Sequence, residues 1–194
     1  MSKSMTVAAI VLLTIGVVRA PAAAAAGGAD LSIGIKFGLS SQSTRMREFG
    51  YEFTEDIGAT YGFRLGARSG RFGLEVSYFY ASQDVRPIGA DPPVVRIERL
   101  RLSNVSVNVL AYILPGSPID PYMTVGYGMY RVHLDPYAGD ANDGLNIGGG
   151  VDIRILKRVS LSAEGKRHWV RVALYGDKVN IGDWTWNFGV NFHF

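Results

Sequence analysis

The last eleven residues of the chain, 184–194, alternate without a break between large apolar side chains and small or polar ones. Successive side chains of a β-strand point to opposite faces, so this alternation predicts a strand with one apolar and one polar face. The apolar face carries Trp184, Trp186, Phe188, Val190, Phe192 and Phe194. Aromatic residues at both ends of such a face are typical of a strand that crosses a bilayer between its two interfaces. The alternative is an aromatic edge strand of a soluble β-sandwich.

The amino-terminal segment predicts export. It carries Lys3, then an apolar run from Val7 to Val18, and then the alanine-rich stretch 20–26. A run of about twelve apolar residues is shorter than the roughly twenty that a transmembrane helix needs. Small residues such as Ala24-Ala25-Ala26 are typical of the cleavage site that follows such a run. We therefore expect residues 1–26 to be a cleaved secretory signal peptide and residues 27–194 to form one domain.

Composition excludes several classes of protein. The chain contains no cysteine, so it has neither a lipid-attachment cysteine nor a disulfide framework. Loss of the leader removes the two basic residues Lys3 and Arg19 and lowers the formal charge from +3 to +1, which gives no reason to expect a nucleic-acid partner. No later segment is apolar for long enough to form a transmembrane helix. A membrane-spanning chain without such helices can satisfy its backbone hydrogen bonds in lipid only as a closed barrel.

Period-two alternation recurs along the mature chain. It predicts eight strands, at residues 31–39, 59–68, 72–82, 100–113, 121–131, 145–156, 159–172 and 184–194. The phase of the alternation slips near Leu102, which predicts a bulge in the fourth strand. An even number of strands permits closure by antiparallel hairpins. We therefore expect an all-β fold, an eight-stranded antiparallel up-and-down transmembrane β-barrel.

The connections between these strands alternate between short and long. Ser69-Gly70, residues 114–120 and Lys157-Arg158 are short, whereas residues 40–58, 83–98, 132–144 and 173–183 are long. In outer-membrane barrels the short turns face the periplasm and the long loops face the outside. We therefore expect both termini on the periplasmic side and the long loops at the cell surface.

Four segments resemble a known family, at residues 121–128, 145–152, 161–164 and 190–194. With them the mature chain resembles the small eight-stranded outer-membrane barrels of the opacity-protein and porin-like type. The resemblance implies a chain that is exported through the periplasm to the outer membrane of a Gram-negative bacterium. The terminal segment, with Val190, Phe192 and Phe194, is similar to the signal by which the barrel-assembly machinery recognises its clients. These motifs are specific for architecture rather than for activity.

Charged side chains fall on the inward faces of the predicted strands. A two-residue turn at Ser69-Gly70 would place Arg64 directly opposite Glu75, and a later hairpin brings Asp152 near Glu164. An unpaired charge in a low-dielectric lumen is costly, so we expect these residues to form a salt-bridged plug in the narrow interior. The predicted network comprises Lys36, Arg64, Glu75, Asp152, Arg154, Glu164 and Lys166.

The histidines argue against an enzyme. Barrels of this size include lipid A deacylases and palmitoyltransferases, which need a histidine beside a serine at the outer rim. The chain has only His133, His168 and His193; none stands in a His-x-Ser pattern, and no two share a strand at metal-ligand spacing. We therefore expect no catalytic residue, no metal and no cofactor.

The expected function is accordingly non-catalytic, a structural or surface-interaction role for a monomeric outer-membrane barrel. The long loops are the expected place for a partner, because function on a rigid barrel usually lies in its loops. A deacylase-like enzyme that modifies lipid A and a narrow channel for small solutes are the alternative functions.

Three arginines predict contact with lipopolysaccharide. Arg131, Arg167 and Arg171 share the outward parity of Val125 and Trp169 but fall above the apolar band. Arginine facing lipid is tolerated near the interface, where it can bind lipid A phosphates. Snorkelling without any lipid preference is the alternative. The expected partners are therefore outer-membrane lipid, lipopolysaccharide and, during biogenesis, the barrel-assembly machinery.

Overall fold

The structure, a computed structural model, describes residues 28–42, 51–53, 57–87, 98–134, 137–174 and 177–194. The expected signal peptide and parts of the expected long connections 40–58 and 83–98 lie outside these ranges. Every regular element in the described part of the chain is a β-strand. Over the same residues, no helix is long and apolar enough to cross a membrane.

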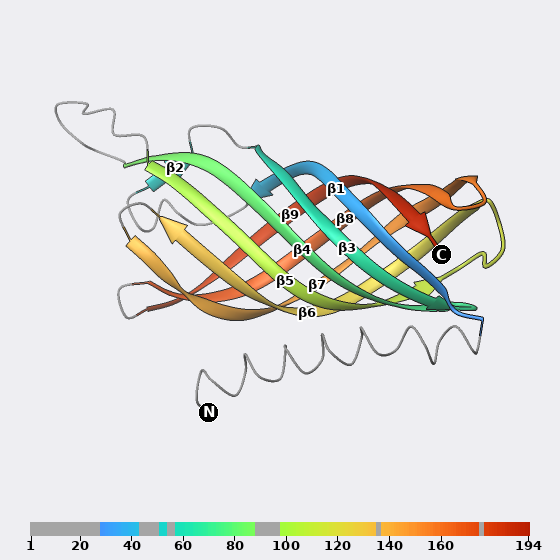
Figure 1. Ribbon diagram of the computed structural model, residues 1–194. Coiled ribbons are helices and arrows are strands. Elements are labelled where there is room, and N and C mark those ends of the chain that lie inside the picture. The colour runs from blue at the N-terminus through green and yellow to red at the C-terminus, as the bar shows by residue number, and fades with distance from the viewer. Residues whose placement is uncertain (1–27, 43–50, 54–56, 88–97, 135–136, 175–176) are drawn as a thin grey trace.

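Eight antiparallel strands close into a barrel (Figure 1). They are β1 (Asp30–Gln42), β3 (Gly58–Ser69), β4 (Phe72–Pro87), β5 (Glu98–Tyr112), β6 (Ile119–Leu134), β7 (Tyr137–Leu156), β8 (Val159–Leu174) and β9 (Asp177–His193). Each strand pairs with the next, and β9 pairs with β1 to close the ring. A three-residue strand, β2 (Tyr51–Phe53), adds to the end of β4. The predicted eight-stranded barrel is confirmed.

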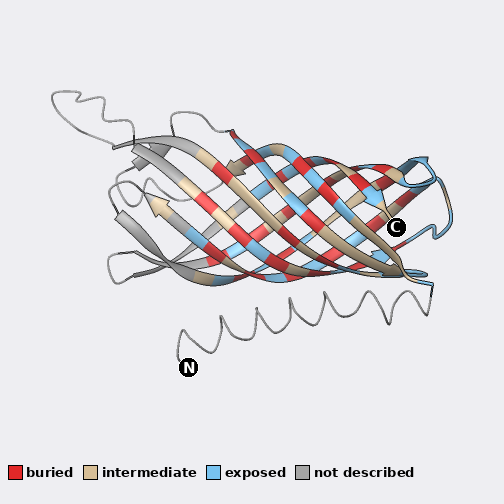
Figure 2. Ribbon diagram, viewed as in Figure 1, coloured by how far each residue is buried: buried red, intermediate tan, exposed pale blue. Residues whose placement is uncertain are grey.

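Side chains alternate between the exterior and the interior of the barrel, as the red and pale-blue segments of Figure 2 show along the strands. On β1, Ile35 and Phe37 are exposed whereas Lys36 between them is buried. On β9, Trp186 and Phe188 are exposed whereas Asn187 is buried. An apolar outside and a polar inside reverse the pattern of a soluble domain, and lipid around the barrel requires that reversal.

The turn between β3 and β4 lies one residue later than predicted. Ser69 is the last residue of β3 and pairs with Phe72, so the turn consists of Gly70 and Arg71. Gly70 has a φ of 58°, which a residue without a β-carbon adopts at little cost. The predicted turn at Ser69-Gly70 is therefore wrong, and every pairing counted from it shifts.

The predicted bulge near Leu102 is also wrong. The strand β5 pairs without interruption with both β4 and β6 through this position. Leu102 is buried, so it breaks the alternation of the sequence because it faces the interior among polar residues. The register shifts lie elsewhere, between Arg131 and His133 and between Arg154 and Leu156.

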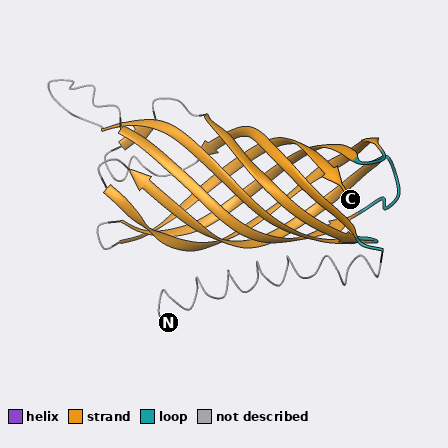
Figure 3. Cartoon of the chain, viewed as in Figure 1, coloured by secondary structure: helices purple, strands orange, loops and turns teal. Residues whose placement is uncertain are grey.

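The two ends of the barrel differ (Figures 1 and 3). One end carries the Gly70–Arg71 turn, the connection 113–118, the predicted turn Lys157-Arg158 and the end of β9, and we call it the turn end. At the opposite end, β6 ends at Leu134 and β7 begins at Tyr137. In the next hairpin, β8 ends at Leu174 and β9 begins at Asp177. The predicted long loops 132–144 and 173–183 are therefore mostly extensions of the β-hairpins.

Interior glycines make room for long charged side chains. Lys36 lies between Gly62 of β3 and Gly189 of β9, and Lys166 lies opposite Gly148. A β-carbon at Gly148 would fall 2.7 Å from Cγ of Lys166 and closer still to the backbone carbonyl oxygen of Gly165, nearer than non-bonded atoms can approach. Glycine at such positions lets a narrow barrel hold side chains that would otherwise overlap.

Gly148→Ala should lower the free energy of unfolding by about 1–3 kcal/mol, because the added methyl group overfills the interior. Urea unfolding of the refolded protein in lipid vesicles measures the loss. The matched variant Gly149→Ala, whose β-carbon points to the opposite face and meets only the carbonyl oxygen of Tyr122 at 3.1 Å, should lose less. Equal losses in the two variants would contradict this packing argument.

Candidate functional site

An ion-pair cluster occupies the barrel interior. Its members are Lys36 on β1, Arg64 on β3, Glu75 on β4, Asp152 on β7, and Glu164 and Lys166 on β8. Each is at most 9% exposed. Three positive charges face three negative ones, so the cluster is formally neutral. Neutrality matters here because a buried charge without a partner is costly.

Glu75 lies at the centre of the cluster. Its Oε1 atom is 3.3 Å from Lys36 Nζ and 3.1 Å from Lys166 Nζ, and its Oε2 atom is 3.0 Å from Arg64 Nε. Asn108 donates a further hydrogen bond to Oε1 at 3.3 Å. Three cations around one carboxylate offset the cost of removing that carboxylate from water.

Glu164 links the two lysines from the other side. Its Oε1 atom is 3.0 Å from Lys36 Nζ, and its Oε2 atom is 3.1 Å from Lys166 Nζ. The hydroxyl group of Tyr122 donates to Oε2 at 3.1 Å. Each lysine is thus shared by Glu75 and Glu164, and the shared pairs connect β1, β4 and β8 across the interior.

The edge of the cluster toward the turn end is less tightly paired. Arg64 Nη1 is 3.8 Å from Asp152 Oδ1, and within the described residues neither atom makes a hydrogen bond. The other carboxylate oxygen of Asp152 accepts a hydrogen bond from Tyr112 at 3.3 Å. At this edge Arg64 Nη1 can therefore still donate a hydrogen bond and Asp152 Oδ1 can still accept one.

The predicted register between Arg64 and Glu75 is wrong, although the two side chains meet. Arg64 lies opposite Ser77, and Glu75 lies opposite Gly66, because the turn comes one residue later. The pair is diagonal across the two strands, a separation that the long side chain of arginine can span.

Arg154 does not join this cluster. It is exposed near the turn end, where its Nη2 atom donates to Asp30 Oδ2 at 2.8 Å and its Nη1 atom donates to the carbonyl of Lys157 at 3.2 Å. The alternation of β7 predicts which face Arg154 occupies, but it does not predict its depth along the barrel.

His168 lies on the opposite side of the cluster from the turn end. Its Nδ1 atom is hydrogen-bonded to the Tyr130 hydroxyl at 2.9 Å, and its Nε2 atom to the Thr185 hydroxyl at 3.0 Å. Its ring packs against Phe79 with the ring centroids 5.1 Å apart. Both ring nitrogens are thus engaged, so this buried histidine is held as a structural group.

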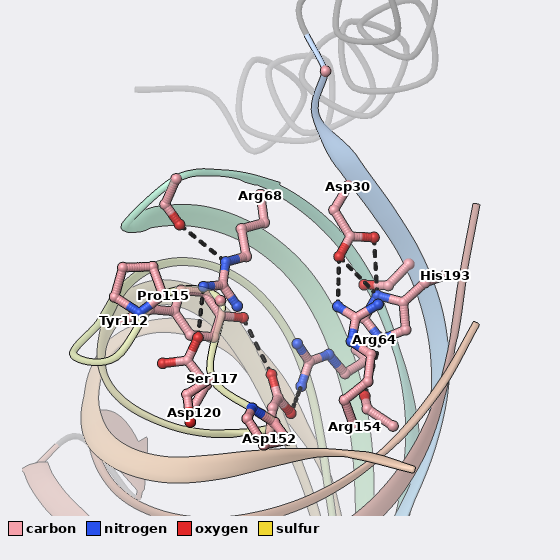
Figure 4. A pocket seen from close by; sticks show the side chains of 16 residues that line it. Asp30, Arg64, Arg68, Tyr112, Pro115, Ser117, Asp120, Asp152, Arg154 and His193 are labelled. Carbon is pink, nitrogen blue, oxygen red and sulfur yellow. Dashed lines mark hydrogen bonds and ion pairs between the residues drawn. The ribbon is translucent and has the colours of Figure 1, made fainter. Parts of the chain in front are cut away.

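A cavity of about 650 Å³ opens at the turn end (Figure 4). Arg68 lines one side of the cavity. Its Nη2 atom is 2.6 Å from Asp120 Oδ2, and its guanidinium carbon lies 3.7 Å from the ring centroid of Tyr112. Arg64 and Asp152 also line it. The cavity therefore ends against the ion-pair cluster.

Asp30, His193 and Ser160 form a hydrogen-bonded chain beside this cavity. Asp30 Oδ1 is 2.9 Å from His193 Nδ1, and His193 Nε2 is 2.9 Å from Ser160 Oγ. The three residues stand on β1, β9 and β8, the strands that meet where the barrel closes. Sequence reasoning missed this chain, because His193 is 163 positions from Asp30 and 33 from Ser160 and no local motif joins them.

The predicted rim arginines lie toward the end opposite the turn end. Arg131 on β6 is exposed. The guanidinium carbon of Arg167 lies 5.7 Å from the ring centroid of Trp169 and 5.4 Å from that of Trp184. The side chain of Arg171 lies outside the described part of the structure.

The predicted assembly signal lies at the turn end. Phe192 and Phe194 are exposed, and Val190 is partly exposed. Phe194 follows the last residue of β9, and its backbone N–H donates to the carbonyl of Leu31 at 2.9 Å. The carboxy-terminal residue is therefore held against the start of β1.

Comparisons with known proteins agree with this architecture. A family model described as outer membrane protein beta-barrel domain matches residues 9–194. No curated protein sequence matches the chain. Similar solved structures include Neisserial surface protein A (NspA), with a TM-score of 0.66 and 15% sequence identity over 84% of this chain and 97% of that one.

Two further solved structures are similar. The outer membrane protein OprG from Pseudomonas aeruginosa has a TM-score of 0.57 and 14% identity over 84% of this chain and 95% of that one. Ail, the attachment invasion locus protein of Yersinia pestis, in complex with the heparin analogue sucrose octasulfate, has a TM-score of 0.52 and 14% identity over 86% of this chain and 99% of that one. At these identities the likeness concerns the fold alone.

Glu75→Ala should lower the free energy of unfolding by about 3–5 kcal/mol, because three buried cations lose their common partner. Combining it with Arg64→Ala should cost less than the sum of the two single losses, since the second change removes one of those cations. Urea unfolding in lipid vesicles measures all three variants. Asn108→Ala removes one hydrogen bond to Glu75 and those to Ser77 and Ser106 but leaves every charge in place, so as the control it should cost less than Glu75→Ala, about 1–3 kcal/mol. Strict additivity of the Arg64 and Glu75 losses would mean that the two residues are not coupled.

Proposed function

The chain belongs to the outer membrane protein beta-barrel domain family, and from that premise we propose that it is a non-conducting barrel with a structural or surface-interaction role. The ion-pair cluster across the interior is the observation that carries this proposal. Exposed apolar residues recur on β1, β3, β6 and β9, which favours a monomer surrounded by lipid.

The cluster is proposed to act as a plug. An eight-stranded barrel is only wide enough for its own side chains to fill the interior. Here Lys36 and Lys166 each bridge Glu75 and Glu164, so the ion pairs reach from β1 to β4 and β8. A solute that crossed the interior would have to separate these pairs, and a narrow channel is for that reason the weaker alternative.

The orientation follows from the two unlike ends of the barrel. Short turns of outer-membrane barrels face the periplasm, so the turn end is assigned to the periplasmic side. The opposite end then extends outward through the hairpins β6–β7 and β8–β9. These hairpins, together with the predicted long connections 40–58 and 83–98, are the proposed surface for an extracellular partner.

Lipopolysaccharide is the proposed lipid partner of the outer rim. In this orientation β6 and β8 run outward, so Arg131 and Arg167 lie at the level of the outer leaflet. The guanidinium group of Arg167 lies near the rings of both Trp169 and Trp184, and tryptophan is typical of the membrane interface. Guanidinium groups at that level can donate charge-assisted hydrogen bonds to lipid A phosphates. Arg171 is included in the proposal on its sequence position alone.

The carboxy-terminal residues are proposed to guide assembly. Val190, Phe192 and Phe194 are the apolar residues of the segment that resembles the signal read by the barrel-assembly machinery. Their exposure and their place at the periplasmic end favour this role, because that machinery meets the chain from the periplasm.

In planar bilayers the protein should show at most small and infrequent openings, because the ion pairs fill the interior. Glu75→Ala/Glu164→Ala, which removes both shared carboxylates, should increase the frequency or size of the openings. Asn108→Ala, which leaves both carboxylates in place, should behave as the unchanged protein. A steady large conductance of the unchanged protein would refute the plug.

Replacing Arg131, Arg167 and Arg171 with glutamine should lower the thermal stability in lipopolysaccharide while leaving it nearly unchanged in neutral detergent. Thermal unfolding in the two media measures the difference. Arg158→Gln, at an exposed arginine of the turn end, is the matched control and should show no such difference. If the triple variant and the unchanged protein unfold at the same temperature in both media, the arginines do not bind lipopolysaccharide specifically. Snorkelling without lipid preference would then explain their position.

A further inference from the structure

The chain Asp30–His193–Ser160 has the order of donors and acceptors that a nucleophilic serine requires. An ionised carboxylate can only accept, so Nδ1 of His193 carries the proton that is shared with Asp30. In the neutral ring Nε2 is then the acceptor, and the hydroxyl group of Ser160 donates to it. A serine that donates to an imidazole oriented by a carboxylate can be activated as a nucleophile.

Neighbouring groups fix this geometry. Arg154 donates to Asp30 Oδ2 at 2.8 Å and so keeps the carboxylate in place. The amide of Asn191 donates to Ser160 Oγ at 3.2 Å, which leaves the serine proton for His193. Gly34 of β1 lies against Asn191, and any larger residue there would displace the amide.

The three hydrogen-bonded residues border a cavity of a size that suits a small molecule. Asp30, His193 and Ser160 all line the cavity of about 650 Å³ at the turn end. Cavities that bind small molecules usually measure about 300–1,000 Å³. Ser160 itself is 1% exposed, so only a slender group can reach its oxygen. The charged walls around Arg68 and Asp120 suit a polar molecule rather than a hydrocarbon chain.

We propose that Ser160, His193 and Asp30 form a hydrolytic site in the periplasmic mouth of the barrel, which cleaves short acyl esters of polar alcohols. The narrow access at Ser160 selects the short acyl group, and the polar cavity accommodates the alcohol. This activity goes beyond the proposed structural role and does not depend on the plug or on the outer rim.

In the first half of the reaction, Ser160 Oγ attacks the ester carbonyl carbon while its proton passes to His193 Nε2. The carbonyl electrons move to the oxygen, which becomes negatively charged in the tetrahedral intermediate. The intermediate then collapses, the bond to the alcohol breaks, and the alcohol leaves with the proton from His193. The products are the free alcohol and an acyl ester of Ser160.

In the second half, water attacks the acyl ester while His193 Nε2 takes its proton. Collapse breaks the bond to Ser160 Oγ, which recovers the proton from His193. A carboxylic acid is released and the site returns to its starting state, with water as the only co-reactant. Asp30 stabilises the imidazolium in both halves.

The refolded protein in detergent micelles should be labelled by a fluorophosphonate probe, which reacts with activated serines, and should hydrolyse p-nitrophenyl acetate. Ser160→Ala should abolish the labelling. Ser162→Ala is the matched control, because Ser162 is buried on the same face of β8 but does not line the cavity; it should be labelled like the unchanged protein. Heat-modifiable migration on gels verifies that each variant is folded.

Asp30→Asn should fold and lower the rate of ester hydrolysis by roughly a thousandfold or more, because the imidazole loses the partner that fixes its tautomer. The same three residues could instead serve only to hold β9 against β1. In that case the folded, unchanged protein would not be labelled, or folded Ser160→Ala would be labelled equally, and either result overturns the proposal. Neither result bears on conductance or on lipopolysaccharide binding, so the two proposals fail separately.

Discussion

Glu75 holds Lys36, Lys166 and Arg64 at one point inside the barrel, and the rest of the interior is arranged around that contact. The members of the ion-pair cluster come from β1, β3, β4, β7 and β8, so neutrality is reached only when strands distant in sequence are all in place. Glycines on the neighbouring strands leave the volume that these side chains need. Two members of the same cluster, Arg64 and Asp152, line the cavity at the turn end.

The alternation of residue types predicted the faces of the strands but not their register. Arg64 and Glu75 were both expected inside, yet their relative position depended on a turn that could be placed at Ser69 or at Gly70. Alternation also carries no information on depth, which is why Arg154 was expected in the plug although it lies at the turn end. Leu102 shows the third limit, since an apolar residue can face a polar interior without any bulge.

The residues at the turn end were beyond sequence reasoning for a different reason. The hydrogen bonds of His193 to Asp30 and Ser160 exist only because β9 pairs with both β1 and β8. A search for histidine and serine close together in sequence tests neighbours along the chain, whereas a barrel creates neighbours across strands. The ion-pair cluster was easier to anticipate, because buried charges must find partners wherever the register places them.

The pairing of β1 with β9 joins the first and the last strand of the barrel, so it has the largest sequence separation of all the strand pairings. Pairings of this kind form late, because the entropy of closing the intervening chain must be overcome first. Until then β1 and β9 each present an unpaired edge, and open edges in an apolar sheet invite aggregation. Before β1 and β9 pair, these two edges are therefore the parts of the sheet most open to pairing with another chain.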